Sequence, residues 1–154
     1  MAIVERQVLG QLEVQLDIVF RPASAADVQI LIERNWPAKV ISFYASSDPH
    51  EVLEKTRPKM RLYSIREIIW AMTTLEPSIT MAPWGYGTFA QNRYGDAYMY
   101  NFNAVDAEGW PEILFADHEM LIGLSEREEM EALLGEVAKN LPTFLQMLAK
   151  GKIE

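Results

Sequence analysis

The chain has 154 residues and a mass of 17.6 kDa, the size of one ordinary domain. Apolar residues make up 49% of it and charged residues 23%, which excludes a disordered or fibrous protein. The absence of cysteine excludes disulfides, thiolate nucleophiles and cysteine-ligated metal sites. The net charge of −8 argues against binding to nucleic acid or to an anionic membrane, because both need a basic protein surface.

The charge is unevenly distributed along the chain. Residues 1–77 contain nine Lys/Arg and ten Asp/Glu residues, whereas residues 78–154 contain five and twelve. The first half also holds a basic cluster, which consists of Lys55, Arg57, Lys59, Arg61 and Arg66. We therefore predict an acidic side formed by the second half and one small basic loop over residues 55–61. An acidic side most often serves solubility, but it is also a surface on which a basic partner docks.

The termini and the hydropathy pattern indicate a cytoplasmic protein. Residues 1–6 lack the basic and apolar regions of a secretory signal. No apolar run approaches the roughly 18 residues that cross a bilayer, and neither end carries a lipidation motif. We expect no contact with a membrane.

The N-terminal region predicts a strand. Residues 3–9 favour only a short helical turn. From Leu12 to Phe20, apolar residues alternate with polar ones, and a period of two is typical of a half-buried strand. Arg21-Pro22 ends this strand, because proline cannot donate to a sheet ladder.

Two helices are expected next. Ser24 is placed to cap the first, with Asp27 three residues later in a weak form of the capping box, and the apolar spacing continues to Asn35. Trp36-Pro37 interrupts the pattern and starts a second, short helix. The polar cluster at residues 46–49 ends it.

A further strand and helix complete the first half of the chain. Leu62, Tyr63 and Ile65 indicate a strand, and Ser64 is a candidate cap for a helix that contains Ile68 to Met72. The order of helices and strands is that of an α+β domain.

The second half predicts an antiparallel meander followed by two helices. Its three strands are expected at residues 88–90, 96–102 and 112–116, with a tight turn at 107–109. A capping box at Ser125 and Glu128 predicts a helix that ends near Gly135, and Asn140 with Pro142 predicts a last helix that runs to Lys150. We predict one α+β domain over residues 1–154, a mixed or antiparallel sheet flanked by helices.

Motifs for catalysis or cofactor binding are weak. The stretch Trp84 to Phe89 has Gly-x-Gly spacing but no phosphate-binding lysine, and no serine lies in a Gly-x-Ser-x-Gly elbow. The segment Asp117-His118-Glu119 lacks the second histidine of a metalloprotease helix. If the fold brings His118 close to His50, the two histidines could form the active site of a small metal-dependent hydrolase, which is a further alternative. We expect no catalytic residue, metal or cofactor, and interpret the polar groups as strand and turn termini.

Several segments, in this order, resemble the SUKH superfamily, bacterial proteins related to the yeast Smi/Knr cell-wall synthesis regulators. The matching segments are Ala25 to Glu33, Trp36-Pro37, Phe43-Tyr44, Arg61 to Ile68, Phe89 to Tyr98, Pro111-Glu112-Ile113, Asp117-His118-Glu119 and Asn140 to Leu148. The resemblance spans residues 23–149. The chain departs from the pattern at Trp36, where leucine is usual, and in its N-terminal strand and the acidic helix near 126–134.

The resemblance implies a non-catalytic α+β domain that binds and neutralises a cognate bacterial toxin, in many cases a nuclease. A regulatory scaffold of the Smi/Knr type is the alternative. The acidic side then becomes a candidate docking surface for a toxin domain with a basic surface. The residues predicted for this surface are the acidic Asp106, Glu108, Asp117, Glu119, Glu126, Glu128, Glu129 and Glu131 and the aromatic Trp84, Tyr86, Tyr94 and Trp110.

Overall fold

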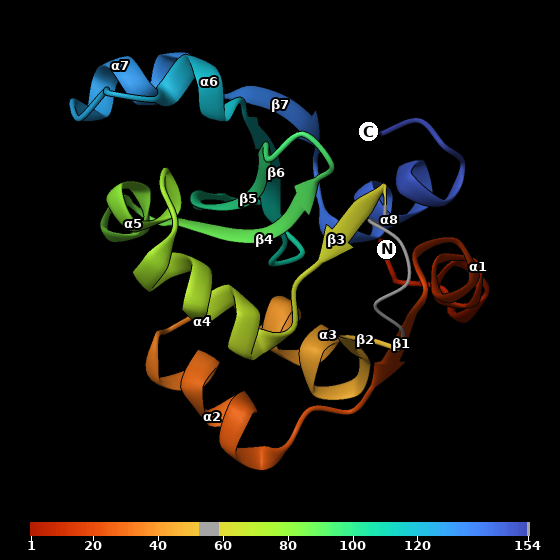
Figure 1. Cartoon of the computed structure of the whole chain (residues 1–154). Coiled ribbons are helices and arrows are strands. Elements are labelled where there is room, and N and C mark those ends of the chain that lie inside the picture. The colour runs from red at the N-terminus through yellow and green to blue at the C-terminus, as the bar shows by residue number, and fades with distance from the viewer. Residues whose placement is uncertain (53–58, 154) are drawn as a thin grey trace.

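A five-stranded antiparallel sheet lies at the centre of the computed structural model, which describes residues 1–52 and 59–153 (Figure 1). Its strands, in spatial order, are β3 (Met60–Leu62), β4 (Tyr86–Asn92), β5 (Ala97–Val105), β6 (Pro111–Ala116) and β7 (Gly135–Ala138). Spatial order equals chain order, so the predicted meander is confirmed. The strand expected at Leu62 to Ile65 forms over Met60–Leu62 and joins one edge of the meander, and β7 adds an unpredicted strand at the other edge. A separate two-stranded antiparallel sheet joins β1 (Ile18–Arg21) to β2 (Asp48–Glu51).

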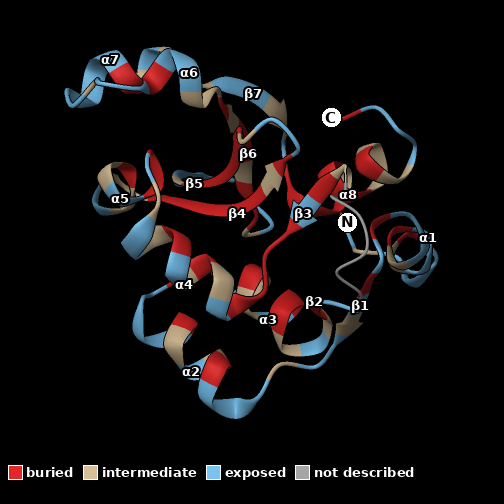
Figure 2. Cartoon of the chain, viewed as in Figure 1, coloured by how far each residue is buried: buried red, intermediate tan, exposed pale blue. Residues whose placement is uncertain are grey.

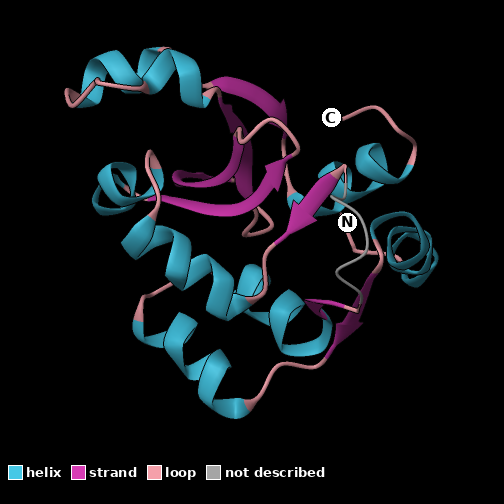
Figure 3. Ribbon diagram, viewed as in Figure 1, coloured by secondary structure: helices cyan, strands magenta, loops and turns pink. Residues whose placement is uncertain are grey.

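Helices lie on both sides of the central sheet (Figure 3), which confirms the α+β class. They are α1 (Arg6–Leu16), α2 (Ala25–Glu33), α3 (Ala38–Ser47), α4 (Ile65–Thr74), α5 (Ser78–Met81), α6 (His118–Leu121), α7 (Arg127–Ala132) and α8 (Leu141–Ala149), with a 3₁₀ turn at Ala82–Trp84. Among the described residues, no helix has the length and apolar character that a bilayer crossing needs.

Three of the helices begin at side-chain caps that the sequence predicts. Ser24 Oγ accepts the backbone N–H of Asp27 at 3.1 Å, which starts α2. Ser64 and Glu67 form a reciprocal capping box at the start of α4. The side chain of Asn140 accepts the N–H of the third residue of α8. Each cap satisfies a backbone donor that has no partner inside its helix.

The predicted N-terminal strand is wrong for most of its length. Residues 6–16 form α1, which buries Val8, Leu12 and Leu16 at a spacing of four, whereas Val14 is 85% exposed. Residues four positions apart lie on the same face of a helix, and they also lie on the same face of a strand, where side chains alternate with a period of two. The apolar pattern of this segment therefore fits both structures. Asp17, in the left-handed conformation, ends the helix, and only Ile18–Arg21 is a strand.

The predicted capping box at Ser125 is also wrong. The helix α7 begins after Glu126, which makes no side-chain cap, and it ends at Ala132. Gly135 starts β7 instead of closing a helix, and this strand pairs with β6 through Phe115↔Gly135. An unpaired β6 edge would expose a row of backbone donors and acceptors, and β7 covers that edge.

The basic loop falls mostly outside the described residues, which include neither Lys55 nor Arg57. Arg61 lies on β3, with its Nε 3.4 Å from Glu51 Oε1, and also pairs with Glu67. Arg66 pairs with Asp27 at 3.0 Å. These two arginines therefore hold elements of the first half together.

Each face of the central sheet carries its own core. Successive residues of β5 alternate, so that Tyr98 and Tyr100 enter the main core and Met99 the second. The central strands are accordingly buried throughout their middle parts (Figure 2). The main core packs α1, α2, α3, α4 and α8, and the second core packs α5, α6 and α7. The second core is the support of the candidate surface described next.

Candidate partner-binding surface

The predicted surface residues separate into two groups. At one end of the β5–β6 ladder Ala97 pairs with Ala116, and at the other end Val105 pairs with Pro111. Asp106, Glu108 and Trp110 lie at the Val105 end. Tyr94 and Asp117 lie at the opposite end, and Glu119 and the four glutamates of the α7 region follow Asp117 in the segment 117–134, which we call the arm. The arm contains α6 and α7 and occupies one edge of the molecule (Figure 1).

Two of the predicted aromatic residues hold the arm against the sheet. The hydroxyl of Tyr86 donates a hydrogen bond to Glu131, and Arg127 Nε donates to the other oxygen of that carboxylate at 3.0 Å. The Arg127 guanidinium also lies 6.0 Å from the centre of a Trp84 ring. Tyr86 is buried. Tyr86 therefore serves as a tether between β4 and α7, and it is not an exposed anchor for a partner.

The tether keeps its protonation state around neutral pH. Burial and the hydrogen bond to Glu131 raise the pKa of Tyr86 to about 12. The hydrogen bonds from Tyr86 and Arg127 lower the pKa of Glu131. At neutral pH the phenol is thus a donor and the carboxylate a charged acceptor, the arrangement that makes a strong hydrogen bond.

The outer face of the arm combines negative charge with exposed apolar side chains. Over residues 117–134 the arm has six Asp/Glu residues and one Lys/Arg residue, Arg127. Glu119, Glu126, Glu128 and Glu129 are all exposed. Met120 is 54% and Ile122 79% exposed beside them. Sequence reasoning missed these two apolar residues, because a short apolar run around Leu121 is more typical of core than of surface.

A groove separates the arm from α5. Its volume is about 370 Å³. Its lining residues are Glu76, Pro77, Thr80, His118, Leu121, Ile122, Gly123 and Leu124. The hydroxyl of Thr80 donates to Glu76 Oε2 at 2.6 Å, so one carboxylate and one hydroxyl form a polar margin on a largely apolar hollow. None of the α5 residues was predicted, since their role depends on the arm folding over them.

At the base of the arm, Asp96 fixes the start of α6. Asp96 Oδ1 accepts the backbone N–H of His118 at 3.2 Å and lies 2.8 Å from His118 Nδ1, and Asn92 Nδ2 donates to Asp96 Oδ2 at 3.2 Å. Burial raises the pKa of Asp96, but the hydrogen bonds from His118 and Asn92 outweigh it and leave the pKa lowered. Asp117 caps α6 through the N–H groups of Glu119 and Met120. These polar groups connect the β4–β5 turn to the arm.

The same base is the described cluster most like a metal site. One ligand atom each from Asp96, Asp117 and His118 lies within 4.8 Å of the others. The contacts just described already occupy both oxygens of Asp96 and one of Asp117. His50 belongs to a different cluster, with its Nε2 3.1 Å from Asp48 Oδ2 on β2. The two histidines therefore do not converge on one centre, which removes the geometry that a hydrolase built on both would need.

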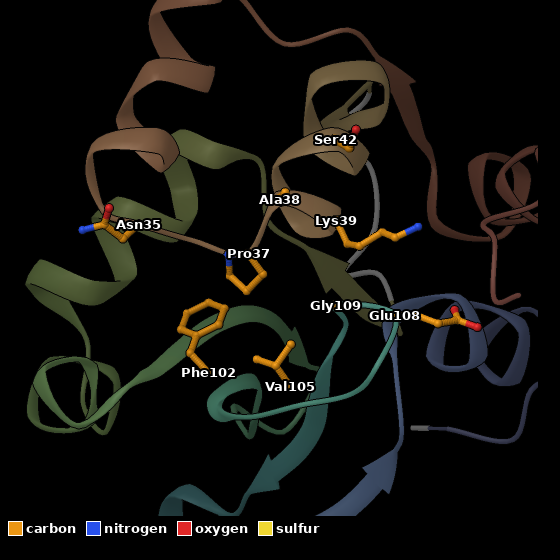
Figure 4. Close-up of a pocket in the computed structure, with 9 residues that line it drawn as sticks. All are labelled: Asn35, Pro37, Ala38, Lys39, Ser42, Phe102, Val105, Glu108 and Gly109. Carbon is orange, nitrogen blue, oxygen red and sulfur yellow. The ribbon is translucent and has the colours of Figure 1, made fainter.

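A second groove lies at the far end of the β5–β6 hairpin, between the hairpin and the start of α3 (Figure 4). Its volume is about 700 Å³. Phe102 and Val105 face Pro37 across it, and Lys39 and Glu108 lie on one side. Glu108 also accepts the backbone N–H of Ala2 at 2.9 Å. The predicted acidic residue at this groove is thus engaged with the N-terminal segment.

The other predicted residues at the hairpin are also structural. Asp106 Oδ1 accepts the N–H groups of Glu108 and Trp110, each at 2.9 Å, and so closes the β5–β6 turn. Trp110 is buried and its indole N–H donates to the carbonyl of Ala2 at 3.3 Å. Among the four predicted aromatic residues, Tyr94 is the most exposed, at 60%, with the Arg93 guanidinium 5.8 Å from its ring centre.

No family model matches the chain, and no curated protein matches it significantly. The functional inference therefore rests on the residues of this chain. Of the two grooves described above, the one beside the arm has a largely apolar lining with one carboxylate, Glu76, and its other side is the arm, which carries exposed carboxylates. The hairpin groove has one acidic and one basic residue, and the acidic one contacts the N-terminal segment.

Proposed function

We propose that the protein is a SUKH-like immunity protein that binds and neutralises a cognate toxin domain in the cytoplasm, with no catalytic residue of its own. The observation that carries the proposal is the arm, a short segment that exposes Met120 and Ile122 as well as four carboxylates. Exposed apolar side chains in a segment that also carries charge are typical of protein-binding surfaces.

The charge of the arm indicates the chemistry of the partner. A nuclease toxin holds phosphates in a basic cleft, and an acidic protein that occupies the cleft excludes the substrate. Opposite charges also steer the two proteins together, which raises the association rate by about ten- to a thousandfold. The charge balance supports this choice, because six acidic residues and one arginine occupy residues 117–134.

The remaining polar groups support a binding role over a catalytic one. His118 is hydrogen-bonded to Asp96 at the base of the arm, and His50 is paired with Asp48 on the two-stranded sheet. Seven serines are present, and the described site brings none of them to His118 as a nucleophile would require. The groups that resemble catalytic residues in the sequence instead connect a turn to a helix.

The experiment is co-expression with the products of neighbouring genes. A toxin encoded beside this gene should kill cells by itself and spare them when this protein is present. If none of the neighbouring products is toxic, or if a toxic one kills equally well in its presence, the proposal is wrong.

The toxin complex then allows a quantitative test of steering. The variant Glu128→Gln/Glu129→Gln removes two exposed charges from the arm, and its matched control, Glu5→Gln/Glu33→Gln, removes two exposed charges from α1 and α2 regions. At low salt, the arm variant should associate about tenfold more slowly, whereas the control should match the wild type. Equal rates for both variants, or rates that do not depend on salt, would contradict the assignment of the docking face.

A further inference from the structure

The groove beside the arm has the features of a pocket for one side chain. Pro77, Leu121 and Leu124 give it an apolar lining, and its volume of about 370 Å³ is at the lower end of the range for small ligand sites. Ile122 lies at its margin and is 79% exposed. An apolar side chain that enters the groove would therefore cover Ile122 as well as the lining.

The exposure of Ile122 is built into the backbone. Its N–H donates to the carbonyl of His118 at 3.1 Å, and the N–H of Leu124 donates to the carbonyl of Leu121 at 3.1 Å. Gly123, between them, has φ of +79°, a left-handed conformation that glycine adopts without strain. This turn presents Ile122 to solvent in a fixed position. A fixed apolar contact loses little conformational entropy when a partner binds.

The charge around the groove selects among possible occupants. Glu76 lines it, and the arm that forms its other side carries the exposed Glu119, Glu126, Glu128 and Glu129, so an acidic peptide or a phosphate would be repelled. A second copy of this chain would bring a like-charged arm. A basic segment of another protein remains as the complementary partner.

We propose that this groove receives an aliphatic or aromatic side chain from a basic segment of the partner protein. A lysine or arginine next to that side chain pairs with Glu76 or with the outer carboxylates of the arm. The inference rests on the proposed function and deepens it, because it assigns the apolar anchor to one end of the acidic face. The charges steer and orient the partner, and the groove supplies the short-range contact that slows dissociation.

Short synthetic peptides test the groove without the toxin. One peptide carries a leucine flanked by lysines, the second has serine in place of leucine, and the third has glutamates in place of the lysines. The leucine–lysine peptide should bind about tenfold more tightly than the serine–lysine peptide, which is the expected gain from burying one aliphatic side chain. The glutamate peptide should not bind. Amide chemical shifts should change at Glu76 and at residues 78–80 and 121–124.

Matched variants assign the effect to Ile122. The variant Ile122→Ser should reduce the difference in affinity between the leucine and serine peptides, whereas Val14→Ser, which alters a similarly exposed apolar residue on α1, should retain the wild-type difference. Both side chains are largely exposed, so both variants are expected to fold with wild-type circular dichroism. Equal binding of the two peptides to the wild type, or shift changes confined to the hairpin groove, would overturn the inference.

The toxin complex separates a failure of this inference from a failure of the proposed function. If Ile122→Ser binds and neutralises the toxin as the wild type does, the groove is not the anchor site, although the immunity function stands. If the peptide results hold and no toxin is neutralised, the groove is a site for basic apolar segments in a protein of another function. A loss of about tenfold in toxin affinity for Ile122→Ser alone supports both.

Discussion

The two faces of the central sheet differ in the kind of core that covers them. On the main-core face, large aromatic side chains pack closely: the Phe89 and Tyr100 rings stack with centres 4.2 Å apart, and Phe144 meets Phe89 edge-on at 5.2 Å. On the arm face, methionines take this place, with Met81, Met99 and Met130 all buried. The helices over the arm face are four to six residues long, and those over the main core nine to eleven.

We interpret the main-core face as the rigid part of the molecule and the arm face as the more adaptable one. Aromatic stacking fixes one geometry, whereas unbranched methionine side chains fill irregular gaps and tolerate small shifts of the elements above them. A docking surface gains from such adaptability, because partner surfaces vary more than folds do. The predictions that follow test whether the two faces behave as differently as their composition indicates.

The largest expected effect is on the main-core face. Phe144→Ala removes a fully buried ring that contacts both Phe89 and Tyr98, and we expect it to lower the free energy of unfolding by about 3–5 kcal/mol. Urea unfolding followed by circular dichroism measures the loss. Val14→Ala, on the exposed side of α1, is the control and should change stability by less than about 0.5 kcal/mol. A loss below about 1 kcal/mol for Phe144→Ala would mean that this core is less rigid than its packing indicates.

The corresponding change beneath the arm should cost less and act locally. Met130→Ala removes a buried side chain of α7 from the second core, with an expected loss of about 2 kcal/mol. Amide hydrogen exchange should accelerate over α6 and α7, while α8 keeps its wild-type protection. If exchange accelerates equally in α8, the two faces unfold as one unit and the proposed contrast between them is wrong.

The helices and strands of the main core are easier to predict from the sequence than the arm, because the interactions that start and end them join residues close together in the chain. Ser24, Ser64 and Asn140 each cap a helix through a residue three positions away, so the signal lies within one turn of the chain. The β5–β6 hairpin likewise depends on a short turn. The α1 helix was missed because the spacing of Leu12 and Leu16 fits a strand as well as a helix.

The candidate surface could be predicted only in part. The excess of carboxylates in the second half is visible in the sequence, and six of them lie in the arm. The groove cannot be predicted from the sequence, because its lining comes from the α5 region and from a segment about forty residues later that includes Ile122. The burial of Tyr86 was equally hidden, since its partner Glu131 is distant in the sequence and lies on a helix whose start was misplaced.

A smaller effect is expected at the joint between sheet and arm, and it depends on pH. Because hydrogen bonds lower the pKa of Asp96 in the folded protein, the carboxylate contributes stability above its unfolded pKa, about 4. That contribution is lost as the pH falls through the lower, folded pKa. Asp96→Asn should therefore cost about 1 kcal/mol at pH 7 and flatten the loss of stability on acidification below about pH 4.

Urea unfolding at a series of pH values measures both parts of that prediction. Glu33→Gln, which neutralises an exposed carboxylate on α2, serves as the control and should keep the wild-type pH profile. An Asp96→Asn profile parallel to that of the wild type would show that Asp96 does not link the stability of the fold to pH.

The smallest expected effect is at the tether itself. Tyr86→Phe removes the hydroxyl that donates to Glu131 but keeps the buried ring, so the second core stays filled and the urea midpoint should shift less than in Asp96→Asn. Amide exchange should accelerate in residues 127–134 and remain unchanged in α6, which Asp96 and Asp117 hold separately. Since the pKa of Tyr86 is raised to about 12, the tether is fully present below the ordinary tyrosine pKa near 10 and is lost as the pH rises through about 12. Wild-type protection of these amides that falls already at pH 8, or equal acceleration in α6, would mean that other contacts hold α7 against the sheet. A confirmed local effect would instead place the freedom of the arm in α7, while the groove beside α6 keeps its shape.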